Sequence, residues 1–317
     1  MGAGHAPHLG RNGRHESPCP AIARGGLYPA IITPMTADDQ INEDAFRQVM
    51  EFNIQAGVHG FWVAGGTGES VMLDDAENMR LAEIAADQSQ GRIKNIMHVG
   101  APTTKRAAKM AEHAAKVGVE AICCVPPFFY GRSHEDIVEH YRIVAAAADL
   151  PFFAYNLPSS TNVEITPDLM KKMQDAVPQL AGLKHSALNF SYVRNFTKMG
   201  LACFIGNCRL MLPALMAGAV GCIDGPPNMV PEPWVALWNA YQAGDLEGAK
   251  VAQDHGTEVA NIVQPASFHA IFKTVISDRL GIDCGVPRPP AQPLSPEVRQ
   301  KILDTIAALG VKKVAMA

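Results

Sequence analysis

The sequence lacks a strong excess of charge of either sign, and this absence narrows the classes of partner that the protein can have. Its 317 residues include 27 Lys and Arg and 31 Asp and Glu, which gives a formal net charge of −4. Nucleic-acid backbones and anionic membrane surfaces bind clusters of positive charge. We therefore expect no nucleic-acid partner and no membrane partner, and small molecules become the default ligands.

Long apolar runs and paired cysteines are missing as well. No stretch of the sequence is long enough to cross a bilayer, and the first two dozen residues lack the hydrophobic core of a secretion signal. Seven cysteines are present, none of them in a Cys-x-x-Cys pair. We interpret them as buried free thiols in a reducing compartment, which predicts a cytoplasmic protein without a disulfide framework or a zinc site.

The opening segment, residues 1–24, is rich in Gly, Pro, His and Arg. This composition predicts a disordered N-terminal tail. His5, His8 and His15 would bind a metal ion there only adventitiously, and a solvated segment is the preferred interpretation. A targeting peptide is the alternative, but the amphipathic pattern of such a peptide is missing.

The rest of the chain alternates between short β-rich runs and amphipathic helical stretches. The expected strands are Leu27–Thr33, Gly60–Ala64, Ile93–Val99, Ala121–Val125, Phe152–Tyr155, Gly182–Lys184, Ala202–Ile205 and Gly221–Ile223. Strands separated by the length of a helix imply right-handed parallel crossovers. Eight such units predict a closed (β/α)₈ TIM barrel over residues 25–244, with a C-terminal helical appendage over residues 245–317.

The active site of such a barrel lies at the carboxyl ends of the strands, so polar residues at these ends are the first candidates. Lys184 ends an apolar strand. If its side chain points inward, burial favours the neutral amine, which can attack a ketone; a side chain that extends to solvent is an equal alternative. Tyr155 ends the preceding strand at the same level. Its phenol can carry protons, and simple packing is the alternative.

The glycine-rich segment Gly65–Ser70 directly follows the second strand. Its glycines let backbone N–H groups approach an anion, and Thr67 adds a hydroxyl. The segment lacks the Gly-Lys-Ser/Thr ending of a phosphate loop and carries the acidic Glu69, so a carboxylate is the better ligand. A tight strand-to-helix turn is the structural alternative.

Together these elements resemble the dihydrodipicolinate synthase/N-acetylneuraminate lyase family. The matching motifs are Gly66-Thr67-Gly68-Glu69, Tyr155-Asn156-Leu157-Pro158, Gly182-Leu183-Lys184, Pro29-Ala30-Ile31-Ile32-Thr33-Pro34 and Gly285-Val286-Pro287-Arg288-Pro289-Pro290. The similarity runs from Gly26 to Leu294. It implies an eight-stranded barrel with a C-terminal helical domain, a homotetramer, and no metal or organic cofactor.

The resemblance also implies the roles of individual residues. Lys184 would form an imine with pyruvate or another 2-oxo acid, and Tyr155 would relay protons. Gly66 and Thr67 would hold the carboxylate, and Ile223 would flank the keto acid. The implied function is a Schiff-base-forming lyase, because a protonated imine accepts the electrons of a breaking bond. The alternative is a dehydratase or deaminase of a 2-keto-3-deoxy sugar acid that uses the same imine.

Two departures from the family pattern argue against a true dihydrodipicolinate synthase. Ser160 stands where these synthases usually carry the arginine that binds aspartate semialdehyde. Phe129 and Gly66 stand at the positions of their relay tyrosine and first loop threonine. Phenylalanine cannot pass a proton, although Tyr130 lies next to it and could partly substitute.

A third departure concerns the acidic pair that sialic-acid lyases carry after the seventh strand. Asn207-Cys208-Arg209 stands in its place, and Arg209 either binds a second substrate carboxylate or faces solvent at a helix start. Ser186 shares the face of Lys184 and is expected to contact substrate, whereas His185 faces outward to a helix.

Two further classes of protein remain open. A metal-dependent aldolase needs carboxylate or histidine ligands at strand ends, where only Asp224 obviously stands. A non-catalytic barrel that binds keto acids would form no adduct at Lys184.

Overall fold

The computed structural model describes residue 22 and residues 25–263 and 268–314. The expected N-terminal tail, with His5, His8 and His15, lies outside these residues except at Ile22. This side chain is completely buried among the inner residues of the barrel. At this position the expected tail is therefore already part of the packed structure.

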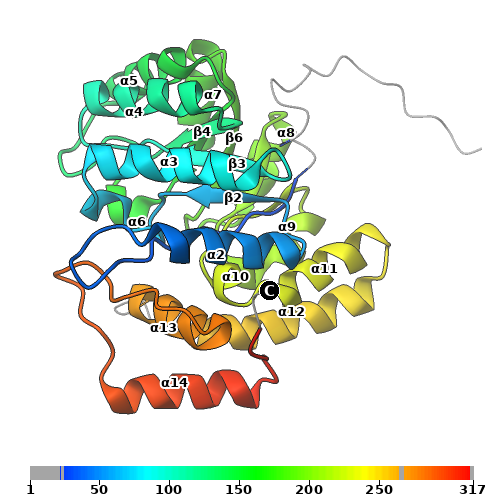
Figure 1. Ribbon diagram of the computed structural model, residues 1–317. Coiled ribbons are helices and arrows are strands. Elements are labelled where there is room, and N and C mark those ends of the chain that lie inside the picture. Colours follow the sequence, from blue (N-terminus) through cyan, green and yellow to red (C-terminus); the bar gives the residue numbers. More distant parts are fainter. Residues whose placement is uncertain (1–21, 23–24, 264–267, 315–317) are drawn as a thin grey trace, which may run out of the picture.

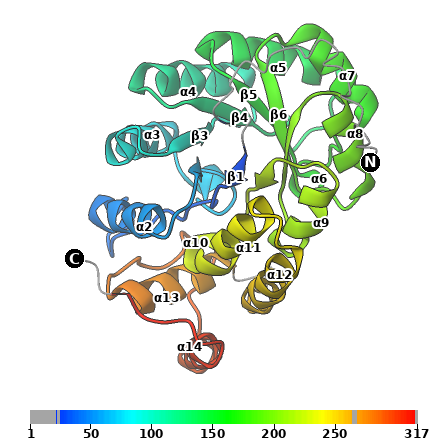
Figure 2. The ribbon, with the colours of Figure 1, turned by 90° about the vertical axis from the view of Figure 1, so that its right-hand side faces the viewer.

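Eight parallel strands form the centre of the molecule. They are β1 (Gly26–Leu27), β2 (Gly60–Val63), β3 (Lys94–His98), β4 (Ala121–Cys124), β5 (Phe152–Asn156), β6 (Leu180–His185), β7 (Ala202–Ile205) and β8 (Gly221–Cys222). Their order is β1-β8-β7-β6-β5-β4-β3-β2. A parallel bridge between Ala30 and Trp62 joins the two ends of this order, so the sheet closes into the predicted (β/α)₈ barrel (Figure 2).

The first strand is shorter than the sequence predicted. Regular pairing with β8 covers only Gly26 and Leu27, and the extended chain beyond them makes single contacts instead. Tyr28 and Ala30 still donate to the carbonyls of Cys222 and Asp224 at 2.9 Å, whereas Pro29, which has no N–H, only accepts from Trp62 on the β2 side at 3.0 Å. The prediction of a continuous strand to Thr33 was therefore wrong.

Helices surround the barrel on the outside (Figure 2). They are α2 (Glu43–Gln55), α3 (Asp75–Ser89), α4 (Thr104–Val117), α5 (His134–Ala148), α6 (Pro158–Thr161), α7 (Pro167–Ala176), α8 (Ser191–Lys198), α9 (Met211–Met216), α10 (Pro226–Met229), α11 (Glu232–Gln242), α12 (Leu246–Asn261), α13 (Phe268–Leu280) and α14 (Pro296–Ala308). Capping boxes begin α3 and α5, where Asp74 and Ser133 accept from the third helical residue.

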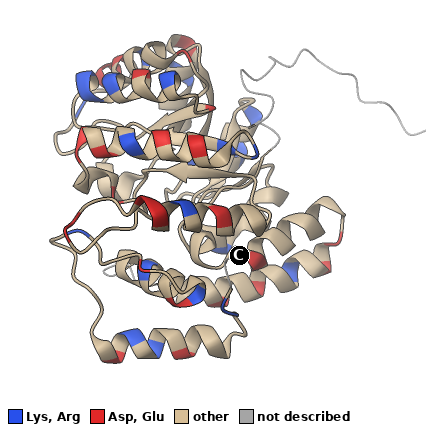
Figure 3. Ribbon diagram, in the orientation of Figure 1, with Lys and Arg blue, Asp and Glu red and all other residues tan. Residues whose placement is uncertain are grey.

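The strands separate two apolar cores because successive side chains point to opposite faces. The larger core lies between the strands and the helices, and the smaller one fills the barrel. Lysine, arginine, aspartate and glutamate lie mixed along the outer helices (Figure 3). Polar side chains that instead point into the barrel, such as Lys184, are therefore exceptions and mark the site.

The C-terminal helices complete the structure. Helix α13 packs against α10 and α14, which places both terminal helices on one side of the barrel (Figure 1). Within the residues that the structure describes, none of the helices combines the length and apolar character needed to cross a lipid bilayer.

Candidate active site

Lys184 points into the barrel, and its side chain is almost completely buried at 3% exposure. Its Nζ atom lies 4.4 Å from the centroid of the Tyr155 ring and 5.1 Å from that of Trp62. No ion pair or hydrogen bond joins this amine to another residue in the described part of the chain. The alternative in which Lys184 extends to solvent is therefore wrong.

Tyr155 stands directly beside Lys184. The two residues are register partners on β5 and β6, which places them at the same level of the barrel. The Tyr155 and Trp62 rings are nearly perpendicular, with centroids 5.4 Å apart. Ile223 belongs to the same inner cluster and is fully buried. The structure thus brings together three of the residues that the sequence singled out or that the resemblance implied.

His98 is a site residue that the sequence analysis missed. It ends β3 as Lys184 nearly ends β6, so the search for polar residues at strand ends could have found it. Its ring lies 6.2 Å from the ring of Tyr155, and its Nδ1 atom bonds the carbonyl of Ala64 at 3.0 Å. Burial lowers the pKa of His98 to about 4. The imidazole is therefore neutral at pH 7.

The glycine-rich segment Gly65–Ser70, which we call the anion loop, follows β2 at the carboxyl end of the barrel. Thr33 donates to the Gly68 carbonyl at 2.8 Å and holds the loop against the segment that follows β1. Gly66 is exposed, and a side chain added there would meet nothing within 4 Å. Open space therefore lies next to the backbone that the sequence assigns to a carboxylate.

Glu69 does not oppose an anion at this loop because its carboxylate is turned away and neutralised. Its Oε1 atom lies 2.6 Å from Lys273 Nζ on α13, with both side chains only 1% exposed. Its Oε2 atom accepts from the backbone N–H of Arg288 at 2.7 Å. Burial lowers the pKa of Lys273 below its ordinary value, and the adjacent carboxylate opposes this shift.

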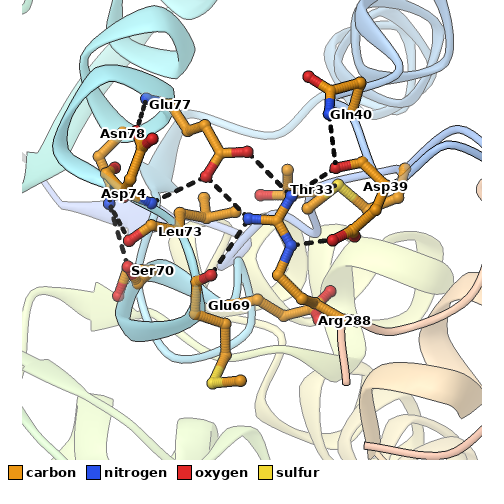
Figure 4. Close-up of polar contacts among 12 residues, drawn as sticks. Thr33, Asp39, Gln40, Glu69, Ser70, Leu73, Asp74, Glu77, Asn78 and Arg288 are labelled. Atoms are coloured by element: carbon orange, nitrogen blue, oxygen red, sulfur yellow. Dashed lines mark hydrogen bonds and ion pairs between the residues drawn. The ribbon is translucent and has the colours of Figure 1, made fainter. Parts of the chain in front are cut away.

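The anion loop is thus anchored from the C-terminal part of the chain. Arg288 also places its guanidinium between Glu77 and Asp39, with Nη1 donating to Glu77 Oε2 at 2.7 Å and Nε to Asp39 Oδ1 at 3.0 Å (Figure 4). His269 on α13 bonds the carbonyl of Gly66 at 2.8 Å. The arginine of the motif Gly285–Pro290 therefore has a structural task, which is to fix the segment after α13 against the loop and α3.

Ser186 follows β6 beside Gly206, the residue after β7. Its Oγ atom is buried and makes no hydrogen bond with a described residue. A Cβ atom at Gly206 would lie only 1.9 Å from this oxygen, so glycine is required there. The expected contact of Ser186 with substrate remains a prediction.

Arg209 is engaged away from the anion loop. Its Nε atom donates to Asn261 Oδ1 at 2.9 Å, and its Nη2 atom bonds the carbonyl of Ala260 at the end of α12. A cation at the C-terminus of a helix is stabilised by the helix dipole. This geometry favours a structural role over the expected contact with a second carboxylate, although Arg209 packs against a helix end rather than facing solvent.

Two other polar candidates also serve the framework. Asp224 accepts from the N–H groups of Cys208 and Gly225, both at 2.8 Å, and thereby fixes the loops after β7 and β8. His185 is fully buried with its ring against Tyr192 and Phe196 of α8, as expected for the outer face.

The residues at the other departures from the family pattern lie on the surface of the chain. Phe129 and Tyr130 follow β4 and are 81% and 65% exposed. Ser160 lies in α6 and is exposed as well. Six of the seven cysteines fall in the described residues; all six are buried and free, as expected.

Comparison with known proteins identifies the family of the chain. The model of the dihydrodipicolinate synthetase family matches residues 23–309. A DapA-like lyase of Halobacterium salinarum is 32% identical over 90% of this chain and 94% of its own length. The N-acetylneuraminate lyase of Escherichia coli is 28% identical over 90% and 95%. The crystal structure of dihydrodipicolinate synthase from Aquifex aeolicus covers 91% of this chain and 99% of its own, with a TM-score of 0.85 and 27% identity. The protein belongs to the dihydrodipicolinate synthetase family and is an enzyme of the lyase class.

Proposed function

We propose that the protein is a Schiff-base-forming aldolase that cleaves a sugar-derived 2-oxo acid to pyruvate and an aldehyde through Lys184. The observation that carries this proposal is the buried Lys184 amine, which lies 4.4 Å from the Tyr155 ring without a hydrogen bond or ion pair to any described residue. No ion pair has to break before this nitrogen attacks a carbonyl. The ring faces of Tyr155 and Trp62 would stabilise the positive charge of a protonated imine.

The reaction balances with the residues at hand. The amine adds to the C2 carbonyl of the substrate, and the adduct takes up one proton and loses water to give the protonated imine; hydrolysis of the imine later returns that proton. The C4 hydroxyl loses its proton as the C3–C4 bond breaks, and the bonding electrons enter the imine to form an enamine. Tyr155 would carry that proton to C3, and hydrolysis of the imine then releases pyruvate and restores Lys184.

The anion loop supports the binding half of this proposal. The N–H groups around Gly66 and the hydroxyl of Thr67 would hold the substrate carboxylate, with Ile223 against the keto acid. The 2.6 Å ion pair with Lys273 keeps the charge of Glu69 from repelling that carboxylate. The backbone around Gly66 would therefore suit a small anion, even though Glu69 makes the sequence of the loop acidic.

The substrate is not aspartate semialdehyde in this proposal. The exposed Ser160 offers a hydroxyl where a true dihydrodipicolinate synthase would use a guanidinium. The family resemblance further supports a homotetramer, which analytical ultracentrifugation of the purified protein would test, and the buried free cysteines among the described residues support a cytoplasmic location.

Borohydride reduction in the presence of pyruvate tests the proposal directly. We expect a covalent adduct on Lys184 by mass spectrometry and none in Lys184→Ala. Lys273 is a matched internal control, because it is also buried but paired with Glu69, and its peptide should stay unmodified. A wild-type protein without an adduct would be a non-catalytic binder. An adduct without carbon–carbon cleavage of any 2-keto-3-deoxy sugar acid would favour the dehydratase or deaminase alternative.

A further inference from the structure

Two aromatic rings beside Tyr155 each carry a buried polar atom without a partner among the described residues. These atoms are His98 Nε2 and Trp62 Nε1, and the side chains are 4% and 0% exposed. A buried polar atom that makes no hydrogen bond is costly, so native structures rarely keep one without a reason. The two rings come from neighbouring strands, β3 and β2.

The hydrogen-bonding capacity of each atom follows from its surroundings. The Ala64 carbonyl, 3.0 Å from His98 Nδ1, can only accept, so Nδ1 carries the proton of the neutral imidazole. Nε2 of His98 is then a hydrogen-bond acceptor. Trp62 Nε1 carries a hydrogen and can only donate. The pair offers one acceptor and one donor.

Both nitrogen atoms lie toward the carboxyl end of the barrel. A Cβ atom at Gly100, in the loop after β3, would come within 2.6 Å of His98 Nε2. A Cβ atom at Gly65, in the anion loop, would come within 2.6 Å of Trp62 Nε1. The nitrogen atoms therefore lie level with the loops that form the mouth of the barrel and are not turned toward its closed end.

The same two rings surround the reacting centre. Their centroids lie 6.2 Å (His98) and 5.4 Å (Trp62) from the centroid of Tyr155, whose ring in turn lies 4.4 Å from Lys184 Nζ. A substrate hydroxyl can donate a hydrogen bond to His98 Nε2, and a substrate oxygen can accept one from Trp62 Nε1. An alkyl chain at this position would leave both atoms unsatisfied.

We propose that His98 is a specificity-determining residue whose Nε2 atom accepts a hydrogen bond from a substrate hydroxyl, with Trp62 donating to a substrate oxygen. The inference rests on the proposed function and sharpens it. The aldehyde half of the substrate carries hydroxyl groups beyond the carbonyl carbon, and the enzyme rejects plain alkyl aldehydes in the synthetic direction.

A pair of variants separates the acceptor from the rest of the ring. In His98→Asn the side-chain amide takes the place of Nδ1, which keeps the bond to Ala64 and removes the acceptor. In His98→Gln the longer side chain restores an acceptor at the position of Nε2. The assay is the rate of addition of pyruvate to glyceraldehyde and to propanal, two aldehydes of equal carbon number, with the 2-oxo acid product measured by mass spectrometry.

We expect the wild-type enzyme to prefer glyceraldehyde over propanal at least tenfold in kcat/KM. His98→Asn should lower this preference by about tenfold, the value of one hydrogen bond, and His98→Gln should recover part of it. Equal losses with both aldehydes in His98→Asn would mean that the ring only shapes the barrel. That result, or a wild-type preference below about threefold, overturns the inference.

Borohydride trapping with pyruvate keeps the two proposals distinguishable. His98→Asn should still form the Lys184 adduct, because pyruvate lacks the hydroxyl that His98 would bind. If the wild type forms no adduct, the proposed function fails. If the adduct forms in every variant while the preference between aldehydes stays constant, only the role of His98 fails.

Discussion

The buried ion pair between Glu69 and Lys273 allows a quantitative test of how the anion loop is held. Replacing Lys273 by methionine keeps most of the side-chain volume and removes the positive charge. The Glu69 carboxylate, 1% exposed, would then retain only the N–H of Arg288 at 2.7 Å. Because removal of one partner leaves a buried charge uncompensated, we expect the free energy of unfolding to fall by about 3–5 kcal/mol.

Urea unfolding, followed by far-ultraviolet circular dichroism, measures this change. Lys313→Met is the matched control, since Lys313 forms a 2.8 Å ion pair with Asp278 while remaining 73% exposed. An exposed pair contributes little, so the control should lose less than about 1 kcal/mol. Glu69→Gln combined with Lys273→Met removes both charges, and this double variant should be more stable than Lys273→Met alone.

The same substitution has an expected effect on activity. Glu69 holds the loop that contains Gly66 and Thr67, so its release should raise KM for the 2-oxo acid by more than it lowers kcat. The reasoning would be refuted if Lys273→Met stayed within about 1 kcal/mol of the wild type. It would also be refuted if the losses in free energy of unfolding of Lys273→Met and Glu69→Gln, each measured alone, simply added up to the loss of the double variant.

Three further outcomes are expected. Tyr155→Phe should lower kcat by about 10²- to 10⁴-fold with the fold intact by circular dichroism, because it removes the phenol that carries protons; wild-type turnover would exclude that role. The free energy of unfolding should decrease as the pH is lowered. The reason is that His98, with a folded pKa of about 4, binds protons more readily in the unfolded chain, where its pKa is near 6.5. The contribution of this group is complete above about pH 7 and decreases by about 2 kcal/mol between pH 7 and pH 5, so urea titrations should show a shallower pH dependence in His98→Asn. Dialysis against a chelator should leave activity unchanged, because in the proposed function a protonated imine on Lys184, and not a metal ion, accepts the electrons of the breaking bond; loss of activity that zinc or magnesium restores would favour the metal-dependent class.

The sequence predicted the barrel and its central pair because both follow from local rules. Apolar runs separated by helical stretches predict parallel crossovers, and the regular spacing placed Lys184 and Tyr155 at neighbouring strand ends. The structure confirmed the fold, and the two residues are register partners. Their chemical roles remain predictions until the adduct is measured.

Contacts between distant parts of the chain were beyond local rules. In the sequence, Glu69 is an acidic residue of a loop. Its partner Lys273 lies far along the chain, so no neighbouring residue indicates that the charge of Glu69 is neutralised. Arg209 looks like an anion ligand from its position, but its guanidinium bonds residues of α12 some fifty positions later. His98 was missed for a different reason: a single histidine in an apolar strand is visible, but its unpaired ring nitrogen is not.

The anchoring of the anion loop makes the order of synthesis relevant to the enzyme. Glu69 is made early, whereas Arg288, whose N–H it accepts, follows 219 positions later. During translation the strands of the barrel can emerge well before the residues that fix the loop. A nascent chain stopped after Gly244 would therefore contain Lys184 and Tyr155 but neither Lys273 nor Arg288, the two residues that hold Glu69 in the folded protein.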